Sequence, residues 1–344
     1  MEMALFDGKR ILVTGGTGSL AKVLIRRLMT GEQGMPKRIT VFSRDEAKQF
    51  FMKLDLEKAY GDKLKFMLGD VRDPDSVVSA VSDADMVFNA AALKQVPACE
   101  YAPFEAVMTN VVGAQNIARA IGQHGFDVEA VVGISTDKAC KPVNVMGMTK
   151  AIQERVMITA NLDCPDTRFI CVRYGNVLAS RGSVIPYFHE QILKGGPVTI
   201  TTADMTRFLL SLDRAVDTIF TALAKANRGE IYVPKVRSAR VVDLADVLIG
   251  DRPIKKKITG IRPGEKIHEI LVSEEEAHRT ENRGDYFAIT PIVPEIRKKT
   301  LTGTLKKEYS SADTLMSKKE IQALLKKHGL LVGDMPLSKS EILV

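Results

Sequence analysis

Short apolar runs and longer helical stretches alternate along the first half of this 344-residue chain. The apolar runs, expected as strands, lie at 10–13, 38–42, 64–68, 86–88, 130–134 and 169–172. The stretches expected as helices lie at 20–29, 45–60, 74–81, 104–123 and 144–161. Strands that alternate with helices of this length form βαβ units with parallel strands. Because the strands are apolar throughout, both faces of the sheet should be covered. The pattern therefore predicts an α/β fold with a doubly wound parallel sheet.

After about residue 175 the pattern becomes irregular, and glycine and proline recur. Such segments are often functional loops on a rigid scaffold. We expect a nucleotide-binding domain at 1–175, to which parts of 205–250 add a strand and a helix. A smaller C-terminal substrate-binding lobe is expected at 176–290. The remaining tail, 291–344, should contain a helix at 317–327 and form either a solvated surface or a subunit contact.

Composition narrows the class of protein. The net charge of +7 favours phosphate-bearing partners, but the basic residues are scattered and no nucleic-acid-binding motif is present. No apolar run is long enough to span a membrane, and the first residues lack the pattern of a signal peptide. The four cysteines lack the paired spacing of a metal site. We expect a soluble, cytoplasmic protein with free thiols, no bound metal and no nucleic-acid partner.

A glycine-rich loop follows the first strand and opens the first helix. Glycines there permit a tight turn and let backbone N–H groups approach a pyrophosphate at the helix N-terminus. This context makes the loop a strong sign of a Rossmann dinucleotide site. The residues expected to contact the cofactor are Gly15, Thr17, Gly18, Ser19 and Leu20.

The end of the second strand bears on the choice of cofactor. An acid directly at this position would select NAD, whereas this chain has Ser43 and Arg44, which can bind a 2′-phosphate. Lys48 is either a further phosphate ligand or a solvated charge. We expect NADP, with NAD possible because Asp45 is close.

Two further strand ends are expected to contact the cofactor, because ligands of open α/β sheets bind at the carboxyl ends of the strands. After the third strand, Asp70 can accept from an adenine amino group while Val71 packs on the ring. After the fourth strand, the small residues Ala90, Ala91 and Ala92 would let the backbone approach the ligand.

The fifth strand closes with residues 135–138, and a helix begins near 144. Met146 and Lys150 are four residues apart and share a helix face, which we expect to point at that strand end. Asp137 and Lys138 are ionisable side chains at that strand end, whereas Met146 has no ionisable proton. A nearby cationic nicotinamide and Lys150 should lower the pKa of Lys138.

With these motifs the sequence resembles the extended short-chain dehydrogenase/reductases. Among them it is similar to the UDP-N-acetylglucosamine 4,6-dehydratases of bacterial polysaccharide and capsule biosynthesis, in particular to the soluble type that inverts C5. The matching segments run along most of the chain, at 15–20, 43–46, 69–73, 90–97, 135–139, 173–177, 180–186, 205–208 and 262–266. The superfamily usually has tyrosine where this chain has Met146, but some relatives share the methionine.

The resemblance implies a reaction and roles for particular residues. Sugar C4 is transiently oxidised, Lys138 removes the C5 proton, protonated Asp137 assists loss of the C6 hydroxyl, and hydride returns to C6. Lys150 would bind the nicotinamide ribose; either Lys138 or Asp137 would take the C4 hydroxyl proton. Tyr174 joins the cofactor site. The substrate-binding residues expected are Lys94, Asn176, Arg181, Arg207, Arg262 and Glu265.

Other functions remain open at this stage. The same scaffold could act as an NADP-dependent UDP-sugar 4-epimerase or reductase, or as a non-enzymatic nucleotide-binding protein. Proteins that resemble this chain form dimers or hexamers, so a homo-oligomer is expected.

Overall fold

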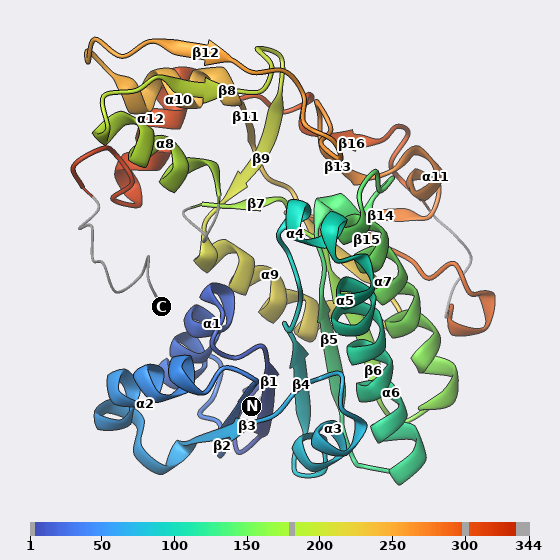
Figure 1. Ribbon diagram of the computed structural model, residues 1–344. Coiled ribbons are helices and arrows are strands. Elements are labelled where there is room, and N and C mark those ends of the chain that lie inside the picture. The colour runs from blue at the N-terminus through green and yellow to red at the C-terminus, as the bar shows by residue number, and fades with distance from the viewer. Residues whose placement is uncertain (1–3, 179–182, 298–302, 335–344) are drawn as a thin grey trace.

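A nine-stranded sheet forms the centre of the computed structural model, which describes residues 4–178, 183–297 and 303–334 (Figure 1). Six parallel strands follow the order β3-β2-β1-β4-β5-β6. They are β1 (Arg10–Thr14), β2 (Arg38–Ser43), β3 (Leu64–Leu68), β4 (Met86–Asn89), β5 (Ala130–Ile134) and β6 (Arg168–Val172). This is the order of a dinucleotide-binding sheet, so the predicted fold class is confirmed. The order reverses between β1 and β4, which puts the ligand crevice at their carboxyl ends.

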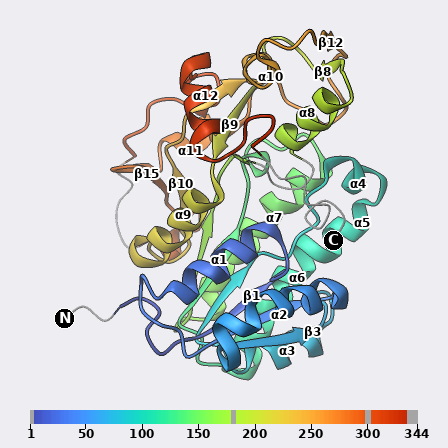
Figure 2. The ribbon, with the colours of Figure 1, turned by 90° about the vertical axis from the view of Figure 1, so that its left-hand side faces the viewer.

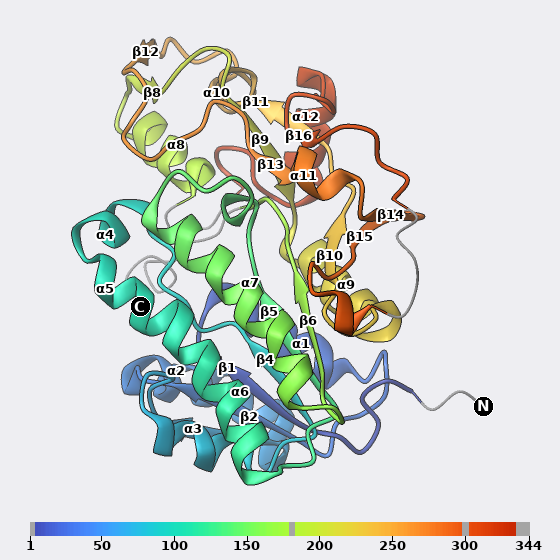
Figure 3. The same ribbon diagram turned by 90° about the vertical axis from the view of Figure 1, so that its right-hand side faces the viewer.

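Helices cover both faces of this sheet. On one face lie α1 (Ser19–Thr30), α2 (Glu46–Tyr60) and α9 (Leu212–Lys225), seen in front in Figure 2. On the other lie α3 (Pro74–Val81), α6 (Gly113–His124) and α7 (Val145–Asp163), seen in Figure 3. Strands β1, β2, β4, β5 and β6 are buried along nearly their whole length between these layers, which explains their continuous apolar sequence, whereas the edge strand β3 is only partly buried.

The single helix expected at 104–123 is divided into several segments. It begins as α5 (Pro103–Ala106), widens into a π-helical stretch over Val107–Val112 and continues as α6. A further short helix, α4 (Val96–Tyr101), precedes it and was not predicted. Proline has no N–H to donate, so Pro103 can begin a helix but cannot continue α4.

The second half of the chain contributes more strands to the large sheet than the sequence predicted. Strand β10 (Ile231–Pro234) pairs in parallel with β6. Beyond it, β15 (Tyr286–Ile289) pairs antiparallel with β10, and β14 (Thr280–Arg283) pairs with β15. Residues 280–289, assigned to the lobe at 176–290, therefore extend the sheet. Their backbone groups pair with the edge that β10 would otherwise leave open.

The smaller lobe has its own core. It combines a three-stranded sheet, a two-stranded sheet and three helices, at the top of Figure 1. The strands are β7 (Asn176–Val177), β9 (Thr206–Leu210), β11 (Ser238–Arg240), β8 (Val198–Ile200) and β12 (Lys256–Ile258). The helices are α8 (Val184–Leu193), α10 (Val241–Ile249) and α12 (Lys318–Lys327).

Part of the basic tail packs on its own chain. Helix α12, expected at 317–327, buries Ile321 and Leu325 completely in the core of the lobe. Strand β16 (Tyr309–Ser310) pairs with β13 (Ile270–Val272). Ile321 and Leu325 of α12 thus pack within the chain, while most of the other residues of the helix are exposed. That the tail contacts another subunit stays a prediction.

In the described part of the chain, every helix falls short of the length or the apolar character that crossing a bilayer requires. The four cysteines are free and buried.

Candidate active site

The glycine-rich loop fits closely against the end of β4. Gly15 has a φ of +62°, and a Cβ there would lie 2.7 Å from the Cα of Ala91. Gly18 begins α1 without a side-chain cap, so the first backbone N–H groups of the helix can bind a ligand. The next residues, Ser19 and Leu20, form the first turn of the helix. A pyrophosphate group fits this arrangement, because only backbone lies close and the helix N-terminus favours negative charge.

At the end of β2, the residues expected to bind a 2′-phosphate differ in availability. The Ser43 hydroxyl is buried, where it accepts from Gln49 Nε2 at 3.1 Å and lies 3.4 Å from Thr17 Oγ1. Lys48 forms an ion pair with Asp45. The Arg44 side chain is 53% exposed, with Nη1 3.8 Å from Asp70 Oδ2. Arg44 is therefore the residue of this group best able to receive a phosphate.

The two residues after β3 that were predicted to bind adenine, Asp70 and Val71, also contact other residues of the protein. Asp70 accepts from Arg72 Nε at 2.9 Å and Nη2 at 2.7 Å. Burial alone would raise the pKa of Asp70, but the bonds from Arg72 outweigh this and lower it. Val71 is buried, and a Cβ on Gly113 of α6 would lie 2.7 Å from its side chain. Val71 thus packs against Gly113 of α6, and its packing on an adenine ring stays a prediction.

The loop after β4 lies beside the carboxyl end of β1. Ala91 N donates to Thr14 Oγ1 at 3.2 Å, which fixes the loop beside the end of β1. Ala90 and Ala91 are half-buried, and Ala92 is exposed. The backbone of this loop and the glycine-rich loop lie together at the carboxyl ends of β1 and β4.

A short 3-10 turn, Asp137–Ala139, carries the predicted acid and base beyond β5. The Asp137 side chain is completely buried; its Oδ1 accepts from Lys138 Nζ at 3.0 Å and from Thr136 Oγ1 at 2.9 Å. Its Oδ2 is buried without a hydrogen-bond partner in the described structure. Asp137 N donates to Tyr174 O at 3.0 Å, which attaches the turn to the end of β6.

Burial raises the pKa of Asp137; Lys138 opposes the shift and Glu269 adds to it. The carboxyl group is therefore easier to protonate than that of a solvated aspartic acid.

The pKa of Lys138 is opposite to the sequence expectation. Burial lowers it, but the attraction of the carboxylates of Asp137 and Glu269 is larger, and the net pKa is raised. Glu269 Oε1 lies 3.3 Å from Lys138 Nζ. The sequence argument counted only the cations around Lys138 and did not include this second carboxylate.

Helix α7 is attached to the acid–base turn at its start. Asn144 caps it through Oδ1, which accepts from Gly147 N at 2.7 Å, while Asn144 Nδ2 donates to Gly264 O at 2.7 Å. A Cβ on Gly147 would lie 2.2 Å from the carbonyl oxygen of Lys138. Glycine at this position thus permits α7 to contact the turn.

Lys150 and Met146 have different surroundings. Lys150 is buried and donates to Ile134 O, at the end of β5, and to Gln153 Oε1. Burial lowers its pKa to about 8. Met146 is also buried, in a small apolar cluster with Cys99 and Ala106. The shared helix face therefore presents an amine to the strand end and a thioether to the α4–α5 region.

The predicted substrate residues differ in burial and in their partners. Asn176 Oδ1 and Glu265 Oε2 are buried without hydrogen-bond partners in the described structure, so both can accept from a ligand. Lys94 and Arg262 are exposed. Arg181 lies outside the described residues.

Arg207, predicted to bind the substrate diphosphate, already has partners within the protein. It is buried and donates through Nη1 to Thr206 O at 2.7 Å and Ile267 O at 3.1 Å. Its Nε lies 3.9 Å from Glu269 Oε1, so it belongs to the charged cluster around Lys138.

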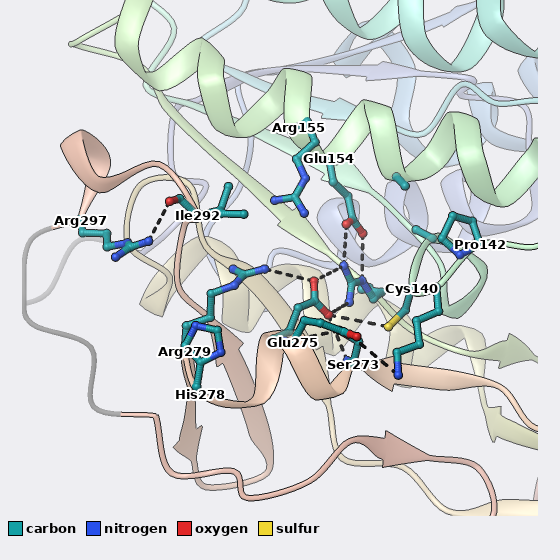
Figure 4. A pocket seen from close by; sticks show the side chains of 15 residues that line it. Cys140, Pro142, Glu154, Arg155, Ser273, Glu275, His278, Arg279, Ile292 and Arg297 are labelled. Carbon is teal, nitrogen blue, oxygen red and sulfur yellow. Dashed lines mark hydrogen bonds and ion pairs between the residues drawn. The ribbon is translucent and has the colours of Figure 1, made fainter.

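A buried ion network lies beside the turn, around the pocket that Figure 4 shows. Arg173, on the segment after β6, pairs with Glu154 at 2.6 Å and with Glu276 at 2.7 Å. Cys140 Sγ lies 3.7 Å from Glu276 Oε2. These residues line a pocket that contains none of the predicted catalytic or binding side chains. We infer that this network stabilises the segment that carries Asp137 and Lys138.

Glu269 is the main site residue that sequence reasoning missed. It lies three positions after Lys266, at the end of a recognised motif and just before β13. A single acid before an apolar run is an ordinary pattern, and the nearby motif was the only sequence signal that could have drawn attention to it.

The model of the family described as "Polysaccharide biosynthesis protein" matches residues 11–291. A Campylobacter jejuni protein named UDP-N-acetylglucosamine 4,6-dehydratase (inverting) is 41% identical, covering 84% of this chain and 85% of that protein. A Rickettsia bellii protein named UDP-glucose 4-epimerase is 44% identical, covering 83% and 84%. The crystal structure of Pen from Bacillus thuringiensis, 34% identical, matches with a TM-score of 0.86 and covers 95% of this chain and 99% of that one.

Proposed function

Since this chain belongs to the polysaccharide biosynthesis protein family, we propose that it is a UDP-N-acetylglucosamine 4,6-dehydratase that uses NADP and inverts C5. The printed name of the Campylobacter relative supports the substrate and the inversion. The product would be a UDP-4-keto-6-deoxy-N-acetylhexosamine.

One observation carries the dehydratase assignment: a fully buried carboxyl group that favours protonation lies 3.0 Å from a lysine amine. Elimination of water across C5–C6 needs a base for the C5 proton and an acid for the departing C6 hydroxyl. Lys138 in its neutral form is the base, and protonated Asp137 is the acid. Met146 cannot exchange a proton, so it fills neither role.

The residues present fit a nicotinamide dinucleotide. The amides around Gly15 and Gly18 would bind the pyrophosphate, Arg44 would bind a 2′-phosphate, and Lys150 would bind the nicotinamide ribose. When bound, the oxidised nicotinamide supplies reversible hydride acceptance and a positive charge that opposes the ionised form of Lys138. The exposure of Arg44 supports NADP over NAD.

For the substrate, we assign the diphosphate to Arg181 and Arg262, and the sugar or its hydroxyls to Lys94, Asn176 and Glu265. The unpartnered oxygens of Asn176 and Glu265 support this assignment. That the chain forms a homo-oligomer, a dimer or a hexamer, stays a prediction, which light scattering of the purified protein measures.

The test is incubation of the purified protein with UDP-N-acetylglucosamine and substoichiometric NADP. We expect a product lighter by one water, formed without added reductant. Run in deuterated water, the reaction should leave solvent deuterium at C5, and coupling constants from NMR report the C5 configuration. Lys138→Ala and Asp137→Asn should each lose product formation. Recovery of intact substrate from the wild-type protein after long incubation would refute the proposal.

The names of relatives such as the Rickettsia protein favour a second candidate, a UDP-sugar 4-epimerase. Epimerisation moves a hydride and a hydroxyl proton at C4 but expels no leaving group, so it has no use for a protonated Asp137. The two functions separate on UDP-glucose: an epimerase gives an isomer of unchanged mass, and its Asp137→Asn variant should remain active.

A further inference from the structure

Two buried carboxylates lie within ion-pair distance of the same lysine. Asp137 Oδ1 lies 3.0 Å from Lys138 Nζ, and Glu269 Oε1 lies 3.3 Å from the same nitrogen. Their side chains are 0% and 3% exposed. Buried carboxylates this close to each other rarely both keep a charge, because each raises the cost of ionising the other.

Neighbouring charges decide which of the two is ionised. Glu269 has two further cations, Arg207 Nε at 3.9 Å from Oε1 and Lys266 Nζ at 4.0 Å from Oε2. Asp137 has Lys138 alone as a cation within ion-pair distance in the described structure. Coulomb attraction therefore favours the negative charge on Glu269.

The pKa directions agree with this geometry. Burial would raise the pKa of Glu269, but Lys138, Arg207 and Lys266 together lower it. Burial raises the pKa of Asp137, and the charge on Glu269 raises it further. A pair whose surroundings separate its pKa values in this way is the usual signature of divided acid and counter-ion roles.

The backbone of Glu269 is fixed independently of this cluster. Glu269 N donates to Ser311 Oγ at 2.9 Å, and Ser311 N donates to Glu269 O at 2.8 Å. Ser311 Oγ also lies 2.6 Å from Thr206 Oγ1, on the residue before Arg207. The smaller lobe and the tail therefore hold the carboxylate in place over the turn from β5.

We infer that Glu269 is a positioning residue of the acid–base centre: it holds the Lys138 amine and keeps the counter-ion charge, so that Asp137 can carry the proton for the leaving hydroxyl. The inference rests on the proposed dehydratase function. It gives a chemical role to a residue outside the recognised motifs, which acts through Lys138 and Asp137.

The principal test is the pH profile of kcat/KM for Glu269→Gln. Loss of this negative charge should lower the pKa values of both Asp137 and Lys138. Activity requires neutral Lys138 together with protonated Asp137, so the two limbs report the pKa values of this coupled pair. Both limbs should therefore move to lower pH, by about one unit. We expect kcat at neutral pH to fall by about 10- to 100-fold, with KM changed less than kcat.

Three comparison variants make the test specific. Glu269→Asp keeps the charge and should restore the position of the profile. Lys266→Met removes a cation and should shift both limbs in the opposite direction, to higher pH, even if Glu269→Gln fails to fold. Glu230→Gln alters a buried carboxylate that pairs with Arg283 at 2.7 Å, far along the sheet at β10; it should leave the profile unchanged.

The outcomes separate this inference from the proposed function. If the wild-type protein releases no water from UDP-N-acetylglucosamine, the proposed function fails before the variants are compared. If the wild-type protein is active, an unshifted Glu269→Gln profile overturns the inference, as does a Lys266→Met profile that stays in place or moves to lower pH. Opposite shifts for the two variants support it, because a packing defect alone would lower activity without moving the limbs.

Discussion

Gly147 and Lys138 approach so closely that a Cβ on Gly147 would lie 2.2 Å from the Lys138 carbonyl oxygen. The first turn of α7 thus rests directly on the backbone of the acid–base turn. Since the neighbouring atom is backbone, the contact can be relieved only by moving the helix or the turn. The position of the Lys138 amine therefore depends on the absence of a side chain at residue 147.

Gly147→Ala should displace the turn and reduce kcat by about 100-fold, because misplacement of a catalytic group by about 1 Å has an effect of that size. The free energy of unfolding should fall by about 1–3 kcal/mol, as for other overpacked sites. Steady-state kinetics and urea unfolding measure the two effects. Gly122→Ala in α6 is the control, because its Cβ meets a cysteine side chain at 3.1 Å. An active Gly147→Ala enzyme would show that the turn tolerates displacement.

A second prediction concerns the glycine-rich loop. Gly15→Ala introduces a Cβ 2.7 Å from the Cα of Ala91 at a φ of +62°. We expect the dissociation constant for NADP to rise more than about tenfold, because the loop must move away from the end of β4. Calorimetric titration with NADP measures it.

Gly8→Ala is the matched control for that prediction. Gly8 has a similar φ of +68°, but its Cβ would meet nothing within 4 Å. It should cost about 1–2 kcal/mol of stability through backbone strain and leave NADP affinity unchanged. If both variants lost NADP affinity equally, the loss would come from backbone strain and not from displacement of the glycine-rich loop.

The third prediction concerns the choice of cofactor. Arg44→Ala should weaken NADP binding by about 10- to 100-fold, the range for loss of a hydrogen bond to a charged group, and change NAD binding little. Lys48→Ala should have a smaller effect, because Lys48 already pairs with Asp45. Titrations of both variants with both cofactors measure this. If Lys48→Ala had the larger effect, the phosphate would bind beside α2.

The sequence predicted those features that depend on neighbours along the chain. The strands at 10–13 and 130–134 have an apolar pattern that follows from burial on both faces, and both are observed as β1 and β5. The glycine-rich loop was recognisable because its turn, its glycines and the following helix are contiguous. Asp137 and Lys138 could be placed together at a strand end for the same reason.

Features that depend on tertiary partners were missed or wrongly interpreted. Whether Ser43 can bind a phosphate depends on its burial beside Gln49 and Thr17, which the local sequence does not record. The pKa of Lys138 depends on Glu269, which reaches it from the smaller lobe. The position of Arg207 beside that carboxylate likewise depends on residues distant in the sequence. No local pattern records these distant contacts, because many sequences of the same local character would leave the side chains in solvent.

The last prediction uses the buried amine of Lys150. Burial lowers its pKa from 10.5 to about 8. Between these two values the unfolded chain binds a proton that the folded chain does not, so stability should rise with pH across this window. The full shift corresponds to roughly 3 kcal/mol. Lys150→Met removes the titrating group, so the free energy of unfolding of the wild-type protein minus that of the variant should increase by that amount between about pH 7.5 and 10.5. Urea unfolding at a series of pH values measures it, and subtraction removes the titration of groups common to both proteins. A difference that stayed constant, or fell, would mean that Lys150 is solvated or paired in the folded protein.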